Sequence, residues 1–240
     1  MSEQDYEASE LDTVRKRISD NLCLVRERIA AAAERSGRSA DDVLLLTVSK
    51  TWPVSIVQAA VDVGARVLGE NRVQEAQAKV PEIEGSPEWH LVGHLQRNKA
   101  KVAVSLFNTI QSVDSVRLAR EIGKHAVNAG KKVSIHLQVN TSGEASKSGV
   151  DPDDLEALVE GVIDVEGLAV VGLMTIAAHT DDVAAVRRCF VALRELRDQV
   201  SRHTPSIHHL SMGMTGDFEM AIDEGATVIR VGTAIFGQRK

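Results

Sequence analysis

The sequence predicts an α/β protein built as a single (β/α)8 TIM barrel that follows an N-terminal helix. Eight short apolar segments alternate with amphipathic segments along the 240 residues, and such alternation is typical of a parallel sheet. No stretch rich in Pro, Gly or Ser divides the chain into halves. Eight units over this length fit a closed barrel. A doubly wound open sheet is the competing fold, although eight strands in an open sheet would leave a clearer edge.

The chain begins with an acidic, polar stretch, residues 1–10, which we expect to be a disordered or frayed tail. Apolar residues then recur at intervals of three and four, which predicts an amphipathic helix at 11–36. Gly37 is a suitable C-terminal cap for this helix. We expect residues 11–240 to form one barrel domain.

The remaining elements follow from apolar runs, periodicity and turn residues. The expected strands cover 43–49, 66–69, 89–93, 108–113, 132–140, 168–174, 207–211 and 227–231. The expected helices cover 54–63, 73–79, 96–106, 115–129, 153–163, 182–201 and 217–224. In a barrel of this kind the chemistry lies at the carboxyl ends of the strands.

Composition narrows the classes of partner. The net charge of −6 argues against a nucleic acid or an anionic membrane as the main partner. Cys23 and Cys189 lack disulfide or metal spacing. The N-terminus lacks the basic and apolar regions of a signal peptide, and no apolar run reaches the length of a membrane span. We therefore expect a cytoplasmic protein, and a monomer.

The first strand leads directly to a lysine. Alternation along the strand puts Lys50 on the same face as Leu46 and Val48, and Pro53 marks the turn that follows. If the strand end opens into a pocket, desolvation makes the Lys50 amine a nucleophile for an aldehyde. The alternative is that Lys50 extends past the strand end to water.

The last two loops contain hydroxyls and glycines. Ser211 and Thr233 offer hydroxyls, while glycines such as Gly213 and Gly232 let backbone N–H groups approach an anion. Barrels frequently bind phosphate with these loops, although the glycines also suit tight turns alone. Together with a lysine on the opposite wall, they favour pyridoxal 5′-phosphate held by its phosphate and by a Schiff base.

Arg230 lies near the mouth end of the last strand. A guanidinium can only donate, so opposite a pyridine nitrogen it would keep that nitrogen unprotonated and weaken the ring as an electron sink. The alternative is an ion pair with a carboxylate such as Glu70. His90 and His94 do not have the context of a helical metal pair, and we expect no metal site.

Several motifs resemble those of the YggS/PROSC family of pyridoxal phosphate homeostasis proteins. They are VSKT at 48–51, GEN at 69–71, WHLVGHLQRNK at 89–99, GLMT at 172–175, SMGM at 211–214 and RVGTAIFG at 230–237. The resemblance runs from about residue 43 to 239. It implies a barrel of the alanine-racemase N-terminal kind (fold type III).

The resemblance also implies roles for individual residues. Lys50 would carry the cofactor, and Arg230 would face the pyridine nitrogen. The implied phosphate contacts are Ser211, Gly232 and Thr233, and Asn71 and Met214 would lie near the cofactor. Lys147, His90 and Met174 are further candidates for handling pyridoxal phosphate.

The function implied is binding, buffering and delivery of pyridoxal phosphate to apoenzymes, with no firm catalytic reaction. The alternative is a pyridoxal-phosphate-dependent amino-acid racemase. Two-base racemisation needs a second proton carrier on the other face of the cofactor. In racemases of this fold class a tyrosine from a C-terminal domain supplies it, whereas the only tyrosine here is Tyr6. His90 or His209 would have to substitute. A third reading, a sugar-phosphate enzyme that uses Lys50, needs Glu70 as its acid–base group.

Overall fold

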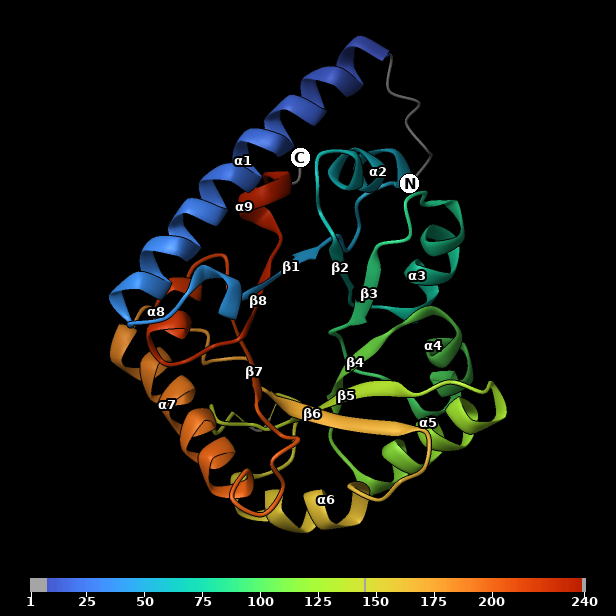
Figure 1. The fold of residues 1–240 in the computed structure, drawn as a ribbon, viewed down its shortest axis with the longest axis vertical. Coiled ribbons are helices and arrows are strands. Elements are labelled where there is room, and N and C mark those ends of the chain that lie inside the picture. The colour runs from blue at the N-terminus through green and yellow to red at the C-terminus, as the bar shows by residue number, and fades with distance from the viewer. Residues whose placement is uncertain (1–7, 145, 239–240) are drawn as a thin grey trace.

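The computed structural model describes residues 8–144 and 146–238. Eight parallel strands form a closed barrel in sequence order, with β1 paired to both β2 and β8 (Figure 1), which confirms the predicted fold. The strands are β1 Leu44–Val48, β2 Val67–Glu70, β3 Glu88–Leu91, β4 Thr109–Val113, β5 Val133–Gln138, β6 Leu168–Met174, β7 His209–Met214 and β8 Val228–Val231.

The helices surround the barrel on its outside. They are α1 Ala8–Arg35, α2 Val54–Asp62, α3 Val73–Lys79, α4 Ala100–Leu106, α5 Val116–Asn128, α6 Leu155–Val162, α7 Val183–Val200, α8 Phe218–Asp223 and α9 Thr233–Phe236. Four 3-10 turns complete the described elements, η1 Ala40–Asp42, η2 Val80–Glu82, η3 Arg97–Lys99 and η4 Pro152–Asp154. None of the helices in the described ranges combines the length and the apolar character needed to cross a membrane.

Three differences from the sequence-based prediction affect the chain's first helix or the loops beside the last two strands. Helix α1 begins at Ala8, so residues 8–10 of the expected tail are helical, and the rest of that tail, 1–7, lies outside the described residues. Strand β7 continues to Met214, three residues beyond its predicted end, and its pairing with β8 shifts register between Ser211 and Met214. The short helix α9 was not predicted.

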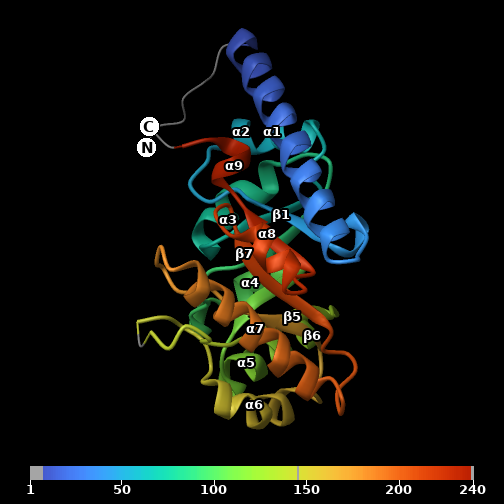
Figure 2. The same ribbon diagram turned by 90° about the vertical axis from the view of Figure 1, so that its left-hand side faces the viewer.

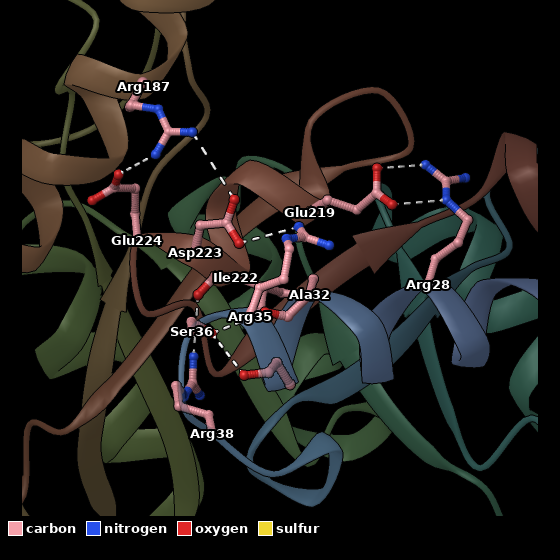
Figure 3. A network of polar contacts seen from close by, with 11 residues as sticks. Arg28, Ala32, Arg35, Ser36, Arg38, Arg187, Glu219, Ile222, Asp223 and Glu224 are labelled. Carbon is pink, nitrogen blue, oxygen red and sulfur yellow. Dashed lines mark hydrogen bonds and ion pairs between the residues drawn. The ribbon is translucent and has the colours of Figure 1, made fainter.

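Helix α1 packs its apolar stripe against α2, α8 and α9, as the two perpendicular views show (Figures 1 and 2). Polar contacts reinforce the packing: the Arg28 guanidinium binds both carboxylate oxygens of Glu219 and lies 4.5 Å from the centre of the Phe218 ring. Figure 3 shows that Arg35 of α1 and Arg187 of α7 both reach Asp223 of α8. These contacts fix α8, which follows β7 directly.

Polar side chains are buried inside the barrel. A small apolar cluster of Leu46, Val67 and Val228 lies near the start of the strands. One hydrogen bond, from the Ser211 hydroxyl on β7 to the Gln111 amide oxygen on β4, connects strands that are not neighbours, so both side chains lie inside the barrel. Buried polar groups must find partners within the protein, and here they find them across the barrel axis.

Candidate functional site

A cavity of about 600 Å³ lies at the carboxyl ends of the strands, where the sequence placed the site. Six of the seven residues proposed to contact the cofactor line this cavity: Lys50, Asn71, Met214, Arg230, Gly232 and Thr233. They come from the ends of β1, β2, β7 and β8. Trp52 and Thr215 are further lining residues, and the Trp52 ring stacks on Phe236 of α9 with 5.6 Å between ring centres.

Lys50 lies in a tight turn after β1 that neighbouring side chains hold in place. The next residue, Thr51, has φ of 66°, a backbone conformation that costs energy for any residue but glycine. The Thr51 N–H donates to a Glu75 carboxylate oxygen of α3 at 2.8 Å. The Lys79 amine donates to the carbonyl of Ser49 at 3.0 Å. The turn is therefore fixed on both sides of Lys50.

Glu70 is fully buried behind this turn. One of its oxygens accepts from the Ser49 hydroxyl and from the Lys79 amine, each at 2.8 Å, and its other oxygen has no partner. Burial raises the Glu70 pKa, and the nearby Lys79 opposes this rise. Because Ser49 alternates with the inward-facing Lys50, Glu70 lies outside the barrel wall. It neither pairs with Arg230 nor lines the cavity, so the ion-pair alternative is wrong and the sugar-phosphate reading lacks the acid–base group that it needs.

Arg230 lines the cavity from β8 and is only 5% exposed. Its Nη1 donates to the Ser211 hydroxyl oxygen and its Nη2 to the Thr175 carbonyl, both at 2.7 Å. Burial lowers the Arg230 pKa to about 10, and the charge of Asp217 opposes the decrease. Arg230 is thus still a cation at neutral pH, able to donate hydrogen bonds and unable to accept them.

The structure corrects the role predicted for Ser211. Its side chain is completely buried, accepts from Arg230 and donates to the Gln111 amide oxygen at 2.6 Å, and it does not line the cavity. Ser211 therefore supports Arg230 and is not placed to bind a phosphate. Thr215, in the same loop and directly before Gly216, lines the cavity in its place. Thr215 could have been found from the sequence, because it follows the glycine-containing end of a predicted strand.

Asp217 shapes the loop that carries Met214 and Thr215. It accepts from the Met214 N–H at 2.5 Å, and its own N–H donates to the Met214 carbonyl at 3.1 Å. Partial burial raises the pKa of this carboxyl, while its hydrogen bond from Met214 opposes the rise. On the facing side of the cavity, a Cβ at Gly232 would lie 3.0 Å from the Val48 carbonyl oxygen, so β1 and the β8 loop approach closely.

The three further candidates do not line the cavity. The Lys147 amine donates to Glu144 and to the Ala177 carbonyl, both at 2.7 Å. Met174 is fully buried in β6. His90 is buried deeper in the barrel, between Gln111 and Glu88. None of the three is among the residues that line the cavity, so their part in handling pyridoxal phosphate stays a prediction.

His209, the other histidine considered as a second base, lies at the opposite end of the barrel. It borders a second cavity, of about 500 Å³, between α1 and the starts of β1 and β2, and its Nδ1 is 3.2 Å from the Thr227 hydroxyl. Among the described residues no group of three or more His, Cys, Asp or Glu side chains is arranged to hold a metal.

The chain is similar to proteins of a known family. Residues 21–240 match the family described as alanine racemase, N-terminal domain. A protein of Aquifex aeolicus named pyridoxal phosphate homeostasis protein is 42% identical over 223 residues, which cover 92% of this chain and 98% of the relative.

Solved structures have the same barrel. A protein of unknown function from Bifidobacterium adolescentis superposes with a TM-score of 0.89 at 41% identity, covering 94% of this chain and 96% of the other. PipY of Synechococcus elongatus, solved with pyridoxal phosphate bound, superposes with a TM-score of 0.81 at 35% identity, covering 92% and 100% of the two chains. An alanine racemase of Clostridium difficile (TM-score 0.73, 15% identity, 92% of this chain and 56% of that one) shares the fold.

Proposed function

Because the chain belongs to the alanine racemase N-terminal domain family, and within it to the pyridoxal phosphate homeostasis proteins, we propose that it binds pyridoxal 5′-phosphate and buffers or delivers this cofactor. The observation that carries the proposal is the cavity that brings the Lys50 amine, the Arg230 guanidinium and the loop Gly232–Thr233 together. PipY, which is similar over the whole domain, has the cofactor bound.

The chemistry of the lining residues fits the cofactor. Bound pyridoxal phosphate supplies an aldehyde, which condenses with a primary amine with loss of water. Lys50 is the one lysine among the described residues that line the cavity. Thr215 and Thr233 offer hydroxyls to the phosphate, and Gly232 leaves room for an anion close to the backbone. Asn71 and Met214 border the space between these two ends.

Arg230 favours holding the cofactor over catalysis with it. As a permanent donor it would leave the pyridine nitrogen unprotonated, which weakens the ring as an electron sink. No observation favours the racemase alternative. Among the described residues that line the cavity, Lys50 and Arg230 are the only titratable side chains, and arginine is a poor proton carrier at neutral pH.

The proposal is tested by reconstitution. Purified protein mixed with pyridoxal phosphate should turn yellow, and borohydride reduction should fix the cofactor on the Lys50 peptide, as mass spectrometry will show. Lys50→Ala should stay colourless. Lys131→Ala is the matched control, because this exposed lysine donates to the Ser105 carbonyl and does not line the cavity, and it should behave as the parent protein. Cofactor absorption that is unchanged in Lys50→Ala would contradict the proposal.

Delivery and catalysis are separated in a second assay. The holoprotein is incubated with a pyridoxal-phosphate-dependent apoenzyme while recovery of that enzyme's activity is followed, and separately with L-amino acids while D-isomers are measured. We expect transfer without D-isomers. Robust D-isomer formation without transfer would reverse the assignment.

We further propose that the protein works in the cytoplasm as a monomer. Cys23 is exposed and Cys189 buried, and both are free thiols, which a reducing compartment preserves. Light scattering of the purified protein tests the oligomeric state, with a mass close to 25.9 kDa expected.

A further inference from the structure

Five side chains form a continuous line of hydrogen bonds through the middle of the barrel. We refer to Arg230, Ser211, Gln111, His90 and Glu88 as the polar chain. Arg230 Nη1 lies 2.7 Å from Ser211 Oγ, and Ser211 Oγ lies 2.6 Å from Gln111 Oε1. Gln111 Nε2 is 2.8 Å from His90 Nδ1, and His90 Nε2 is 2.8 Å from the Glu88 carboxylate. The chain crosses from β8 to β7, β4 and β3.

The polar chain joins the two ends of the barrel. Arg230 lines the cavity at the carboxyl ends of the strands, whereas Glu88 is the first residue of β3 and its side chain is 47% exposed at the opposite end. The three residues between them are buried. Groups buried in this way are costly unless every donor and acceptor is satisfied.

The two ends of the polar chain fix the direction of every bond in it. A guanidinium only donates and an ionised carboxylate only accepts. Ser211 therefore accepts from Arg230 and gives its own proton to the Gln111 oxygen. This choice turns the Gln111 NH2 toward His90 Nδ1, which must be the unprotonated nitrogen, and leaves the His90 Nε2–H to donate to Glu88. With a neutral His90, any other set of bond directions leaves a donor of the polar chain without an acceptor.

The opposite orientation of the Gln111 amide would leave hydrogen-bonding groups of the polar chain without partners. A reversed amide would donate to Ser211, which would then accept two bonds while its own proton lost its acceptor. His90 would need a proton on Nδ1, and a neutral ring would then oppose a bare Nε2 to the Glu88 carboxylate. The Ser211 lone pair that receives Arg230 is thus held in place by Gln111, and the Gln111 amide is held by His90.

We propose that Gln111 and His90 are positioning residues, which act through Ser211 to orient the Arg230 guanidinium toward the pyridine nitrogen of the bound cofactor. The inference rests on the proposed binding of pyridoxal phosphate. Arg230 is fixed by two bonds, one to Ser211 and one to the Thr175 carbonyl. Loss of the first lets the guanidinium turn about the second, so the donors that face the cavity lose their direction.

Other ionisable groups near the polar chain do not offer Arg230 a competing acceptor. His136 on β5 has no hydrogen-bond partner for either ring nitrogen, and burial, with the charge of Arg230 acting in the same direction, keeps its pKa far below the usual value. It therefore remains neutral at pH 7. Asp217 carries the nearest opposing charge, and it accepts from the Met214 N–H, in the loop beyond β7.

The test compares Gln111→Leu with Gln138→Leu. Gln138 on β5 is equally buried, but its amide donates to the Ser148 carbonyl and not to the polar chain. We expect Gln111→Leu to bind pyridoxal phosphate about tenfold more weakly, as the loss of one hydrogen bond to a charged group implies, and to shift the visible absorption band of the bound cofactor. Gln138→Leu should keep the band of the parent protein. An unchanged band and affinity in a folded Gln111→Leu protein would overturn the proposal.

Two variants of His90 test whether an acceptor in place of Nδ1 is enough to hold the Gln111 amide. In His90→Asn the amide oxygen takes the place of Nδ1 and still accepts from Gln111, so the band and affinity should be retained. In His90→Gln the amide takes the place of Nε2 and Gln111 loses its acceptor, so both should change as in Gln111→Leu. The opposite ranking of these two variants would contradict the proposed direction of the chain.

A further measurement uses the parent protein without cofactor, so it depends neither on a substitution nor on cofactor binding. Nitrogen-15 NMR of the histidine side chains should show His90 protonated on Nε2 and bare on Nδ1. A proton on Nδ1 would refute the directional argument. If the parent protein takes up no pyridoxal phosphate, the proposed function fails, whereas parent binding with unaffected Gln111 and His90 variants overturns only the positioning role.

Discussion

At the scale of single residues, the site depends on side chains that do not touch the cavity. Lys50 is preceded by Ser49 and followed by Thr51, whose backbone groups bind Lys79 and Glu75 of α3. Arg230 is held by Ser211 in the same way. The sequence predicted Lys50 and Arg230, because a lysine after an apolar strand and an arginine at a strand end are visible in one dimension. Their supports depend on partners that come together only in the folded barrel.

His136 provides a pH prediction at this scale. It is buried with a strongly lowered pKa, so the folded protein cannot take up a proton that the unfolded chain accepts near pH 6.5. Its neutral form therefore stabilises the fold fully above pH 6.5, and that stability is lost as the pH falls below it. In His136→Leu, a change of similar volume, the decrease in unfolding free energy between pH 7.5 and 5.5 should be smaller by about 1.4 kcal/mol.

Urea unfolding of both proteins at the two pH values measures this difference. The comparison within each protein removes the effect of the substitution on packing. A decrease as steep in His136→Leu as in the parent would show that His136 does not contribute to the pH dependence.

At the scale of elements, the strands could be predicted from the sequence, but the carboxyl end of β7 could not. Alternation and apolar runs located all eight strands to within a few residues. Strand β7 continued further because Gly213, with φ of 91°, lets the chain shift register against β8 and continue to Met214. A pattern of period two cannot reveal such a shift. The prediction therefore ended the strand at Ser211 and took its hydroxyl for the phosphate, whereas in this loop Thr215, beyond the shift, lines the cavity.

Gly213 gives the prediction for this scale. A Cβ there would lie 2.6 Å from the Ala221 Cβ and 2.9 Å from the Phe218 Cα, at a backbone angle that side chains rarely adopt. Gly213→Ala should therefore lower the unfolding free energy by at least about 1–3 kcal/mol from backbone strain alone. Gly216→Ala, in the loop that follows β7, is the control, since nothing lies within 4 Å of its Cβ position. Equal melting temperatures for the two variants would contradict the argument.

At the scale of the whole molecule, the sequence predicts the closed sheet but does not predict the polar line inside it. Eight alternating units predict closure from length and order alone. The line from Glu88 to Arg230 depends on the neighbouring strands β3 and β4 lying across the barrel from β7 and β8, which no local pattern encodes. Helix α1 is the reverse case, because its apolar stripe was plain in the sequence and its partners α8 and α9 were not.

The stripe of α1 predicts how strongly that helix is needed. Ile18 is completely buried, whereas Leu24 on the same helix is 54% exposed. Ile18→Ala should lower the unfolding free energy by about 2–5 kcal/mol through lost burial and the cavity left behind, and Leu24→Ala by no more than about 0.5 kcal/mol. Denaturant titration measures both, and similar losses would mean that α1 is not an integral part of the core.

The pairing of β1 with β8 has a consequence for how the protein is made. Lys50 leaves the ribosome early, and the loop Gly232–Thr233 that faces it is synthesised almost two hundred residues later. A nascent chain holds both walls of the pocket only once its last strand has docked beside its first. Pyridoxal phosphate is therefore bound late in biosynthesis, and a partly made polypeptide does not bind it.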